Sequence, residues 1–199
     1  REIIEEAGKS TRFMTPPTRG FRLLRDAVLS LSLTEAFVRP LYHWRTSRPH
    51  EYSHSSLNSR DDDNARFQAG PAHGAPPLNV RLTDEQFLLD HLGGGFDLLW
   101  FGAADALPAD VLASVAQWRA KGLPLRITCI NQGVGADAGM APGPSEMPWL
   151  QVLSDPQGRV HSRYGVTTPG AAYLLRPDQH ICARWLCLDA QRLDAALMQ

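Results

Sequence analysis

The chain has 199 residues, of which 43% are hydrophobic and 21% are charged, and its formal net charge is −1. This apolar content is enough for a packed core and excludes wholesale disorder. The balanced charge excludes an overall field that favours nucleic acid or an anionic membrane. No apolar run approaches the roughly 18 residues that a membrane span needs. We therefore expect a soluble protein with one ordinary domain, or with a small domain and an attached piece.

Two helices are expected in the first 45 residues. Residues 1–14 start inside an amphipathic helical pattern without a cap, which indicates a piece of a longer polypeptide, and the prolines at 16–17 end this helix. A second helix is expected over 18–38, with Thr18 as its N-cap. Its apolar side chains cover a broad arc: Phe21, Leu23, Leu24, Val28, Leu29, Leu31, Leu33, Phe37 and Val38. We expect this arc to be buried against something other than residues 82–199.

Residues 46–81 are polar, rich in turn residues and without a sustained period, so they are expected to form an irregular strap or a linker. The consecutive carboxylates at 61–63 cannot all face one metal ion, and we interpret them as a solvated charge run. The histidines of this part of the chain fit none of the usual zinc spacings (His43, His50, His54 and His73). We therefore expect no metal site here.

Residues 82–199 are expected to form one α/β domain. Thr83 and Gln86 can cap a short helix over 84–92. The apolar run 96–102 predicts a strand that is buried on both faces. The remaining elements are predicted as a helix from Pro108 to Trp118, strands at 124–130 and 149–155, a helical turn at 160–166, an antiparallel hairpin of 171–178 and 180–188, and a helix at 189–198. This order is that of a thioredoxin-like sheet of four or five strands flanked by helices.

The cysteines argue against redox chemistry. Cys129, Cys182 and Cys187 form no CxxC pair, and we expect reduced, mostly buried thiols in a cytoplasmic protein. A thioredoxin carries its dithiol in the turn after the first of these strands, but residues 102–106 contain no sulfur. Arg176, Asp178 and His180 are interpreted as polar cover for the hairpin turn.

Four segments carry a family resemblance. GPAHGAPPLNVRL (70–82) and LLDHLGGGFDLLWFG (88–102) resemble the junction after the catalytic region of FAD-dependent aromatic hydroxylases of the phenol hydroxylase and 3-(3-hydroxyphenyl)propionate hydroxylase group. RYGVTTPGAAYLLRPDQHICARW (163–185) is similar to the terminal signature of this group, and TRFMTPPTRGFRLLRDAVLSL (11–31) to the helices that close its flavin and substrate region. The resemblance implies a C-terminal part with a thioredoxin-like domain that lacks CxxC.

The resemblance implies FAD, NAD(P)H and O2 for the full-length enzyme, which would hydroxylate a phenolic compound. No GxGxxG fingerprint is present, because the glycines at 93–95 precede a strand. We therefore assign no catalytic, cofactor-binding or metal residue, and we expect this chain alone to bind no cofactor and to be inactive. Its expected partner is the missing flavin-binding region or a second copy, as in a homodimer.

An alternative from another class is a stand-alone, redox-inactive thioredoxin-like binding module. A thiol peroxidase or reductase is disfavoured because Cys129 lies inside a strand pattern and not at the start of a helix. The coding sequence upstream of Arg1 would separate the first two readings, since only the hydroxylase requires a flavin fingerprint there.

Overall fold

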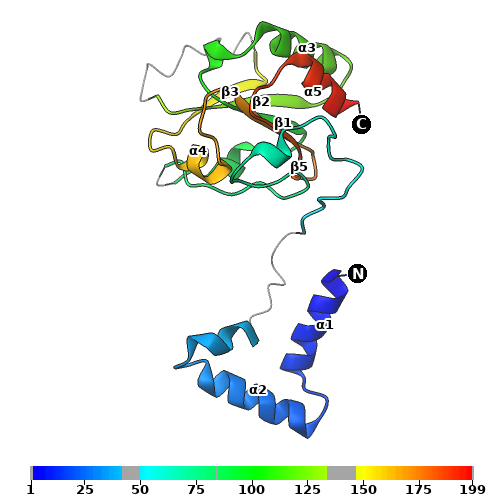
Figure 1. The fold of residues 1–199 in the computed structure, drawn as a ribbon, viewed down its shortest axis with the longest axis vertical. Helices are drawn as coiled ribbons and strands as arrows, with labels where there is room; N and C mark the ends of the chain where they lie inside the picture. The colour runs from blue at the N-terminus through cyan, green and yellow to red at the C-terminus, as the bar shows by residue number, and fades with distance from the viewer. Residues whose placement is uncertain (1, 42–49, 84, 134–146, 199) are drawn as a thin grey trace. The chain divides into compact units, whose positions relative to one another are not determined.

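The computed structural model describes residues 2–41, 50–83, 85–133 and 147–198 (Figure 1). The chain divides into two compact units, Arg1–Pro49 and His50–Gln199. The unit that contains the sheet thus begins at His50, upstream of the boundary at residue 82 that the sequence suggested. None of the described helices is both long and apolar enough to cross a membrane.

The first unit contains α1 (Glu2–Met14), α2 (Arg19–Leu31) and the 3-10 helix η1 (Ala36–Leu41). Thr18 caps α2, since its hydroxyl accepts a hydrogen bond from the backbone N–H of Phe21 at 3.3 Å. The predicted helix over 18–38 is therefore shorter than expected. It ends where the hydroxyls of Ser32 and Thr34 donate to the carbonyls of Leu29 and Leu31, because such local bonds compete with helix continuation.

The second unit is built on one five-stranded sheet, which confirms the predicted fold class. The strands are β1 (Phe96–Phe101), β2 (Leu125–Asn131), β3 (Leu150–Ser154), β4 (Ala171–Leu175) and β5 (Ile181–Trp185). Their order is β3-β2-β1-β4-β5, in which β1, β2 and β3 are parallel and β4 is antiparallel to both of its neighbours. The helices are α3 (Ala109–Ala120), α4 (Arg159–Tyr164) and α5 (Ala190–Leu197).

Both faces of the sheet are covered, as predicted for β1. Alternate residues of a strand point to opposite faces. Leu98 and Trp100 join the cluster that includes Val111 and Val115 of α3 and Leu193 of α5. Leu99 and Phe101 join a second cluster on the other face, which includes Val160 and Tyr164 of α4 together with Phe67, Val80, Leu88 and Tyr173.

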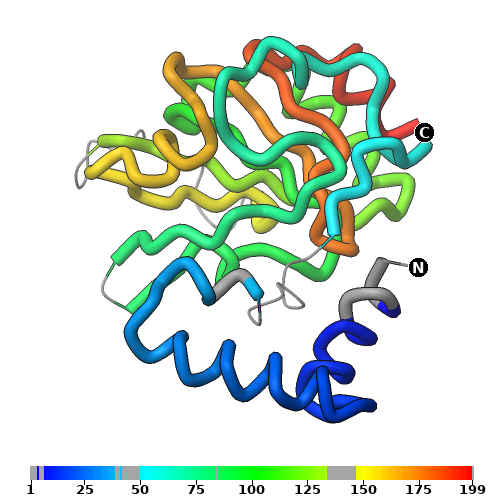
Figure 2. Tube along the Cα trace, turned by 60° about the horizontal axis from the view of Figure 1, so that its bottom comes forward, coloured from blue at the N-terminus to red at the C-terminus, as the bar shows by residue number. Residues whose placement is uncertain are grey.

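Residues 50–82, called the strap below, complete this second face (Figure 2). Phe67 and Val80 are buried in its cluster. The strap also hydrogen-bonds to β5, since the N–H groups of Ser59 and Asp63 donate to the carbonyls of Cys182 and Arg184 at 2.7 and 2.9 Å. An edge strand with open hydrogen-bonding groups invites pairing with another chain. The irregular strap therefore covers this edge of the sheet.

The helix expected over 84–92 is wrong in type and extent. Arg81 and Phe87 form an isolated antiparallel bridge, and the 3-10 helix η3 (Leu88–His91) follows. The hydroxyl of Thr83 accepts from the N–H of Gln86 at 3.2 Å, as a cap would, but it closes a turn. The chain turns back because the N–H of Leu88 donates to the carbonyl of Val80, which fixes Leu88 in the core.

Candidate functional site

Three segments that are distant in sequence meet where the parallel strands β1 and β2 end and the antiparallel strand β4 starts. This row of strand ends is called the sheet edge, and it is distinct from the edge strand β5. The N–H of Gly170 donates to the carbonyl of Phe101 at 2.8 Å, and the N–H of Gly102 donates to the carbonyl of Ile130 at 3.0 Å. These bonds hold the segment before β4 beside the turn after β1.

A cavity of about 320 Å³ lies at this edge. Its apolar lining comes from the end of β1, the following turn and the segment before β4: Phe101, Ala103, Ala106, Val166 and Pro169. Its polar lining is Asn131, Gln132, His161, Thr167 and Thr168, with Gly102 between the two groups. The cavity includes the turn after β1, whose residues contain no sulfur.

A buried carboxylate fixes the histidine of this cavity. The side chain of Asp155 is 3% exposed and accepts a hydrogen bond from Nδ1 of His161 at 2.9 Å. It also accepts from the backbone N–H groups of Arg159, Val160 and His161 at 2.8–3.1 Å. The imidazole meets the ring of Phe101 edge to face, with centroids 5.1 Å apart. His161 therefore has one defined orientation at the cavity wall.

Sequence reasoning did not single out Asp155 and His161. A local signal exists, because Asp155 precedes the turn Pro156–Gly158, and an aspartate in that place commonly caps the helix that follows. The position of His161 beside Phe101 depends on packing between α4 and β1 and leaves no mark in the sequence.

The structure places all three cysteines as free thiols. Cys129 on β2 and Cys182 on β5 are buried, and burial raises the pKa of each thiol to about 12. Cys187 lies beyond β5 and is exposed, so it does not share a strand with Cys182 as the sequence suggested. None of the three lines the cavity at the sheet edge.

The carboxylates at 61–63 are not the solvated run that the sequence suggested. Asp61 is exposed, but the side chains of Asp62 and Asp63 are each 7% exposed. Asp62 accepts from Nδ1 of His73 at 3.0 Å. Asp63 accepts from Nη1 of Arg192 at 3.0 Å. Burial raises the pKa of Asp63, but its hydrogen bonds from Arg192, Leu186 and Arg66 outweigh burial and lower it below the ordinary value. The local sequence does not indicate that these carboxylates are buried and hydrogen-bonded, because the side chains that bind them lie further along the chain.

Arg176, Asp178 and His180 form the turn cluster that the sequence suggested. The guanidinium of Arg176 donates to both carboxylate oxygens of Asp178 at 3.1 and 2.8 Å, and this contact lowers the pKa of Asp178. Nε2 of His180 lies 3.3 Å from the carbonyl of His50. His54 is exposed, and His43 lies outside the described residues. Within the described ranges no group of three or more histidine, cysteine or carboxylate side chains is placed to hold a metal ion.

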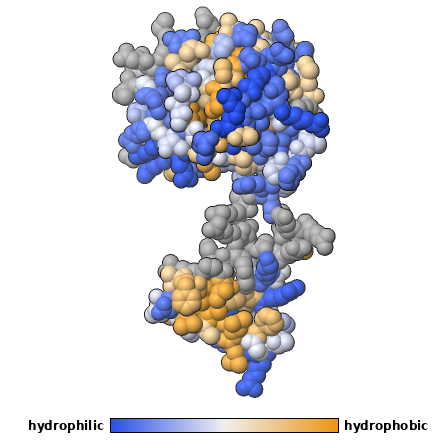
Figure 3. Space-filling model, viewed as in Figure 1, coloured by the Kyte–Doolittle hydropathy of each residue, from blue (hydrophilic) through white to orange (hydrophobic). Residues whose placement is uncertain are grey.

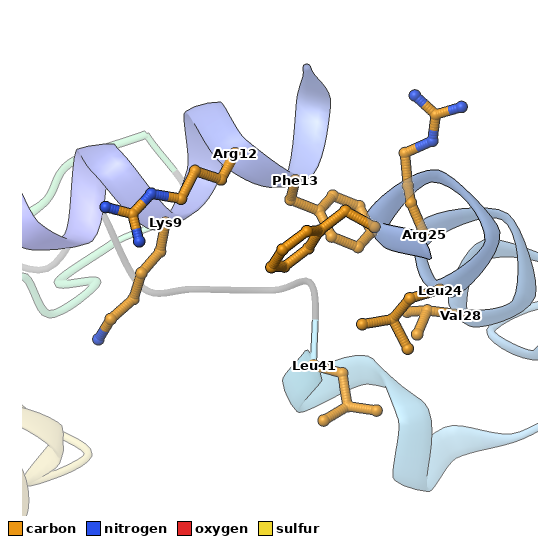
Figure 4. A pocket seen from close by; sticks show the side chains of 8 residues that line it. Lys9, Arg12, Phe13, Leu24, Arg25, Val28 and Leu41 are labelled. Atoms are coloured by element: carbon orange, nitrogen blue, oxygen red, sulfur yellow. The ribbon is translucent and has the colours of Figure 1, made fainter. Parts of the chain in front are cut away.

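The helical unit has its own cavity of about 270 Å³ between α1, α2 and η1 (Figure 4). Its floor is apolar, and Phe13, Leu24, Val28 and Leu41 point toward a shared space. Lys9 and Arg12 lie along its rim. Figure 3 shows apolar residues gathered over the same helical unit.

No known protein family and no curated protein sequence matches the chain. The rebeccamycin biosynthetic enzyme RebC, solved with reduced flavin, aligns over 98% of this chain and 33% of its own, with a TM-score of 0.55 and 22% identity. The flavin-dependent monooxygenase PieE, solved with FAD and substrate, aligns over 92% of this chain and 31% of its own, with a TM-score of 0.53 and 18% identity. This chain thus spans about a third of the length of these enzymes. At such identities the likeness shows a shared fold and no more.

Proposed function

We propose that this chain is the C-terminal third of a flavin-dependent monooxygenase that hydroxylates a phenolic compound with NAD(P)H and O2. Its own part in that enzyme is to pack against the flavin-binding region and to support a dimer. The resemblance of residues 11–31, 70–82, 88–102 and 163–185 to aromatic hydroxylases supports this proposal. The shared fold with RebC and PieE, which extends over nearly the whole chain, supports it as well.

The observation that carries the proposal is the exposed apolar face of the helical unit. Among its described side chains, Val28 and Val38 are buried. Large apolar side chains remain exposed all along it: Ile4, Met14, Phe21, Leu23, Leu24, Leu29, Leu31, Leu33, Phe37 and Leu41. Each of these forgoes roughly 1.5–3 kcal/mol of burial, and monomers rarely tolerate an apolar patch above a few hundred Å². A further protein surface that covers this face removes that cost.

The described residues do not fit a flavin dinucleotide, and we assign no step of flavin chemistry to them. In the dinucleotide fold, backbone N–H groups at the turn from the first strand to its helix hold the pyrophosphate. Here that turn contains Asp105, whose negative charge opposes a phosphate. The N–H of Gly93 already donates to the buried carboxylate of Asp97 at 2.7 Å. FAD in the proposed enzyme is therefore held by the other two thirds.

The experiment starts from the reading frame upstream of Arg1. Its product is expressed as a separate polypeptide together with the 199-residue chain, and the purified material is assayed for bound FAD and for NAD(P)H oxidation that depends on a phenol. We expect a stable complex that contains FAD. The variant Leu24→Asp should weaken the complex at least tenfold, because it places a charge on the apolar face.

Ser30→Asp is the matched control, since it adds the same charge to α2 at an exposed polar position. It should leave the complex intact. An upstream sequence without a flavin fingerprint, or equal effects of the two variants, would contradict the proposal. The stand-alone binding module would then be the better interpretation.

A further inference from the structure

The cavity at the sheet edge has the position and composition of a ligand site. In open α/β sheets, ligands bind beyond the carboxyl ends of the parallel strands. This cavity lies at the carboxyl ends of the parallel strands β1 and β2 and includes the segment before β4. A volume of about 320 Å³ with mainly apolar walls and a few polar groups suits a small molecule.

His161 provides a defined hydrogen-bonding atom in this cavity. The carboxylate of Asp155 can only accept, so Nδ1 of His161 carries the proton that the two groups share. In the neutral imidazole Nε2 is then an acceptor. The described residues provide no hydrogen-bond partner for Nε2, and this atom is not among their fully buried unpaired atoms. A ligand in the cavity can therefore donate to it.

The charges around the cavity favour a neutral ligand. Its lining residues include no lysine, arginine, aspartate or glutamate. An anion would thus find no cation in the wall, and the buried carboxylate of Asp155 behind His161 would repel it. The side chains of Ala103, Ala106 and Pro169 offer apolar surface to a flat ring.

We propose that this cavity binds a small neutral aromatic alcohol, whose hydroxyl donates a hydrogen bond to Nε2 of His161 and whose ring packs against Ala103, Ala106 and Pro169. Thr167, Thr168 and Gln132 provide further polar groups for substituents. The site lies wholly within the unit His50–Gln199. This proposal does not depend on the proposed flavin enzyme, and it is tested separately.

The test is a titration of the full 199-residue chain, followed by NMR of amide and histidine side-chain nitrogens, with phenol and with its methyl ether anisole. Both probes have the same ring, but anisole has no donor. We expect phenol to shift the amides of Gly102, Gln132 and Thr168 together with Nε2 of His161, and to bind about tenfold more tightly than anisole.

Three variants test whether phenol and anisole bind in this cavity. His161→Phe removes the acceptor and should make phenol and anisole bind equally. Ala103→Leu fills the cavity without touching the pair of Asp155 and His161, and it should weaken both probes at least tenfold. Ala116→Leu adds the same bulk to an exposed position of α3 and should change neither.

Amide spectra of each variant show whether the fold is retained, and Ala103→Leu keeps the test decisive if His161→Phe unfolds. Phenol binding that is absent, that equals anisole binding in the unmodified chain, or that Ala103→Leu leaves unchanged would overturn the proposal. Tighter binding of benzoate than of phenol would also overturn it, because it would indicate an anion site.

Discussion

At the scale of the residue, Gly70 shows how closely the strap fits the sheet unit. Its φ is +84°, and a Cβ built on it would lie 2.2 Å from the carbonyl oxygen of Tyr164. Gly94 has the same φ of +84°, but no atom lies within 4 Å of its built Cβ. The two glycines thus share a backbone conformation that disfavours a side chain, and they differ in the space around it.

We expect Gly94→Ala to lower the free energy of unfolding by about 1 kcal/mol, which reflects its positive φ alone. Gly70→Ala should lower it by about 3 kcal/mol, because the strap must also move away from α4. Urea denaturation of both variants at one pH measures the difference. Equal losses for the two would show that the contact of Gly70 with Tyr164 is not rigid.

At the scale of the element, the strap acts as a structural layer. It buries Phe67 and Val80, and it supplies the partners of Arg184, which is 5% exposed. Nε of Arg184 donates to Oδ1 of Asn64 at 2.7 Å, and Nη1 donates to the carbonyl of Ala69 at 3.1 Å. Without the strap, this guanidinium would lose these partners on a newly exposed apolar surface.

We therefore expect a truncated chain of residues 50–199 to keep the stability of the sheet unit, and a chain of residues 83–199 to lose about 5 kcal/mol. A domain of this size has a total stability of only about 5–15 kcal/mol, so the shorter chain should be largely unfolded or should expose its core. Thermal unfolding and binding of a hydrophobic dye compare the two. Matching melting temperatures would refute the role given to the strap.

Elements whose identity depends on local pattern could be predicted from the sequence. The strand β1 is indicated by its mostly apolar run, and the cap at Thr18 by its hydroxyl before an apolar stripe. The strap could not be predicted in this way. In the sequence, Asp62, Asp63 and Asn64 resemble solvated turn residues. Their partners His73, Arg192 and Arg184 are brought beside them only by the fold.

The candidate site, too, could be predicted only in part from the sequence. The order of strands predicts which edge brings the turn after β1 beside the segment before β4, and the missing sulfur at residues 102–106 is evident in the sequence. The pair of Asp155 and His161 was not predicted. Asp155 follows the edge strand β3, whereas the cavity lies at the ends of central strands. Packing of α4 against Phe101 and the hydrogen bond from the N–H of Asp155 to the carbonyl of Asn131 connect them.

At the scale of the whole molecule, the two units differ in how well each covers its own apolar residues. The sheet unit buries residues on both faces, whereas the helical unit leaves side chains such as Leu33 and Phe37 at 86% and 74% exposure. We therefore expect a partner surface to cover the helical unit.

We expect light scattering to report a dimer or a larger assembly for the full 199-residue chain and a monomer for residues 50–199. The variant Leu24→Asp should shift the full chain toward monomer, because charge at an apolar contact is costly. Ser30→Asp should leave its mass unchanged. A monomer for the unmodified chain at concentrations of about 100 μM would contradict this expectation.

The hydrogen bonds between the strap and β5 also bear on how the chain folds as it is made. The N–H groups of Ser59 and Asp63 pair with the carbonyls of Cys182 and Arg184, which a ribosome adds more than a hundred residues later. At about 5–20 residues per second, that interval is on the order of 10 s. During this interval the cluster that covers Phe67 and Val80 is only partly complete, because Tyr164 and Tyr173 are synthesised near its end. We therefore expect the sheet unit to close only after its last strand has been synthesised.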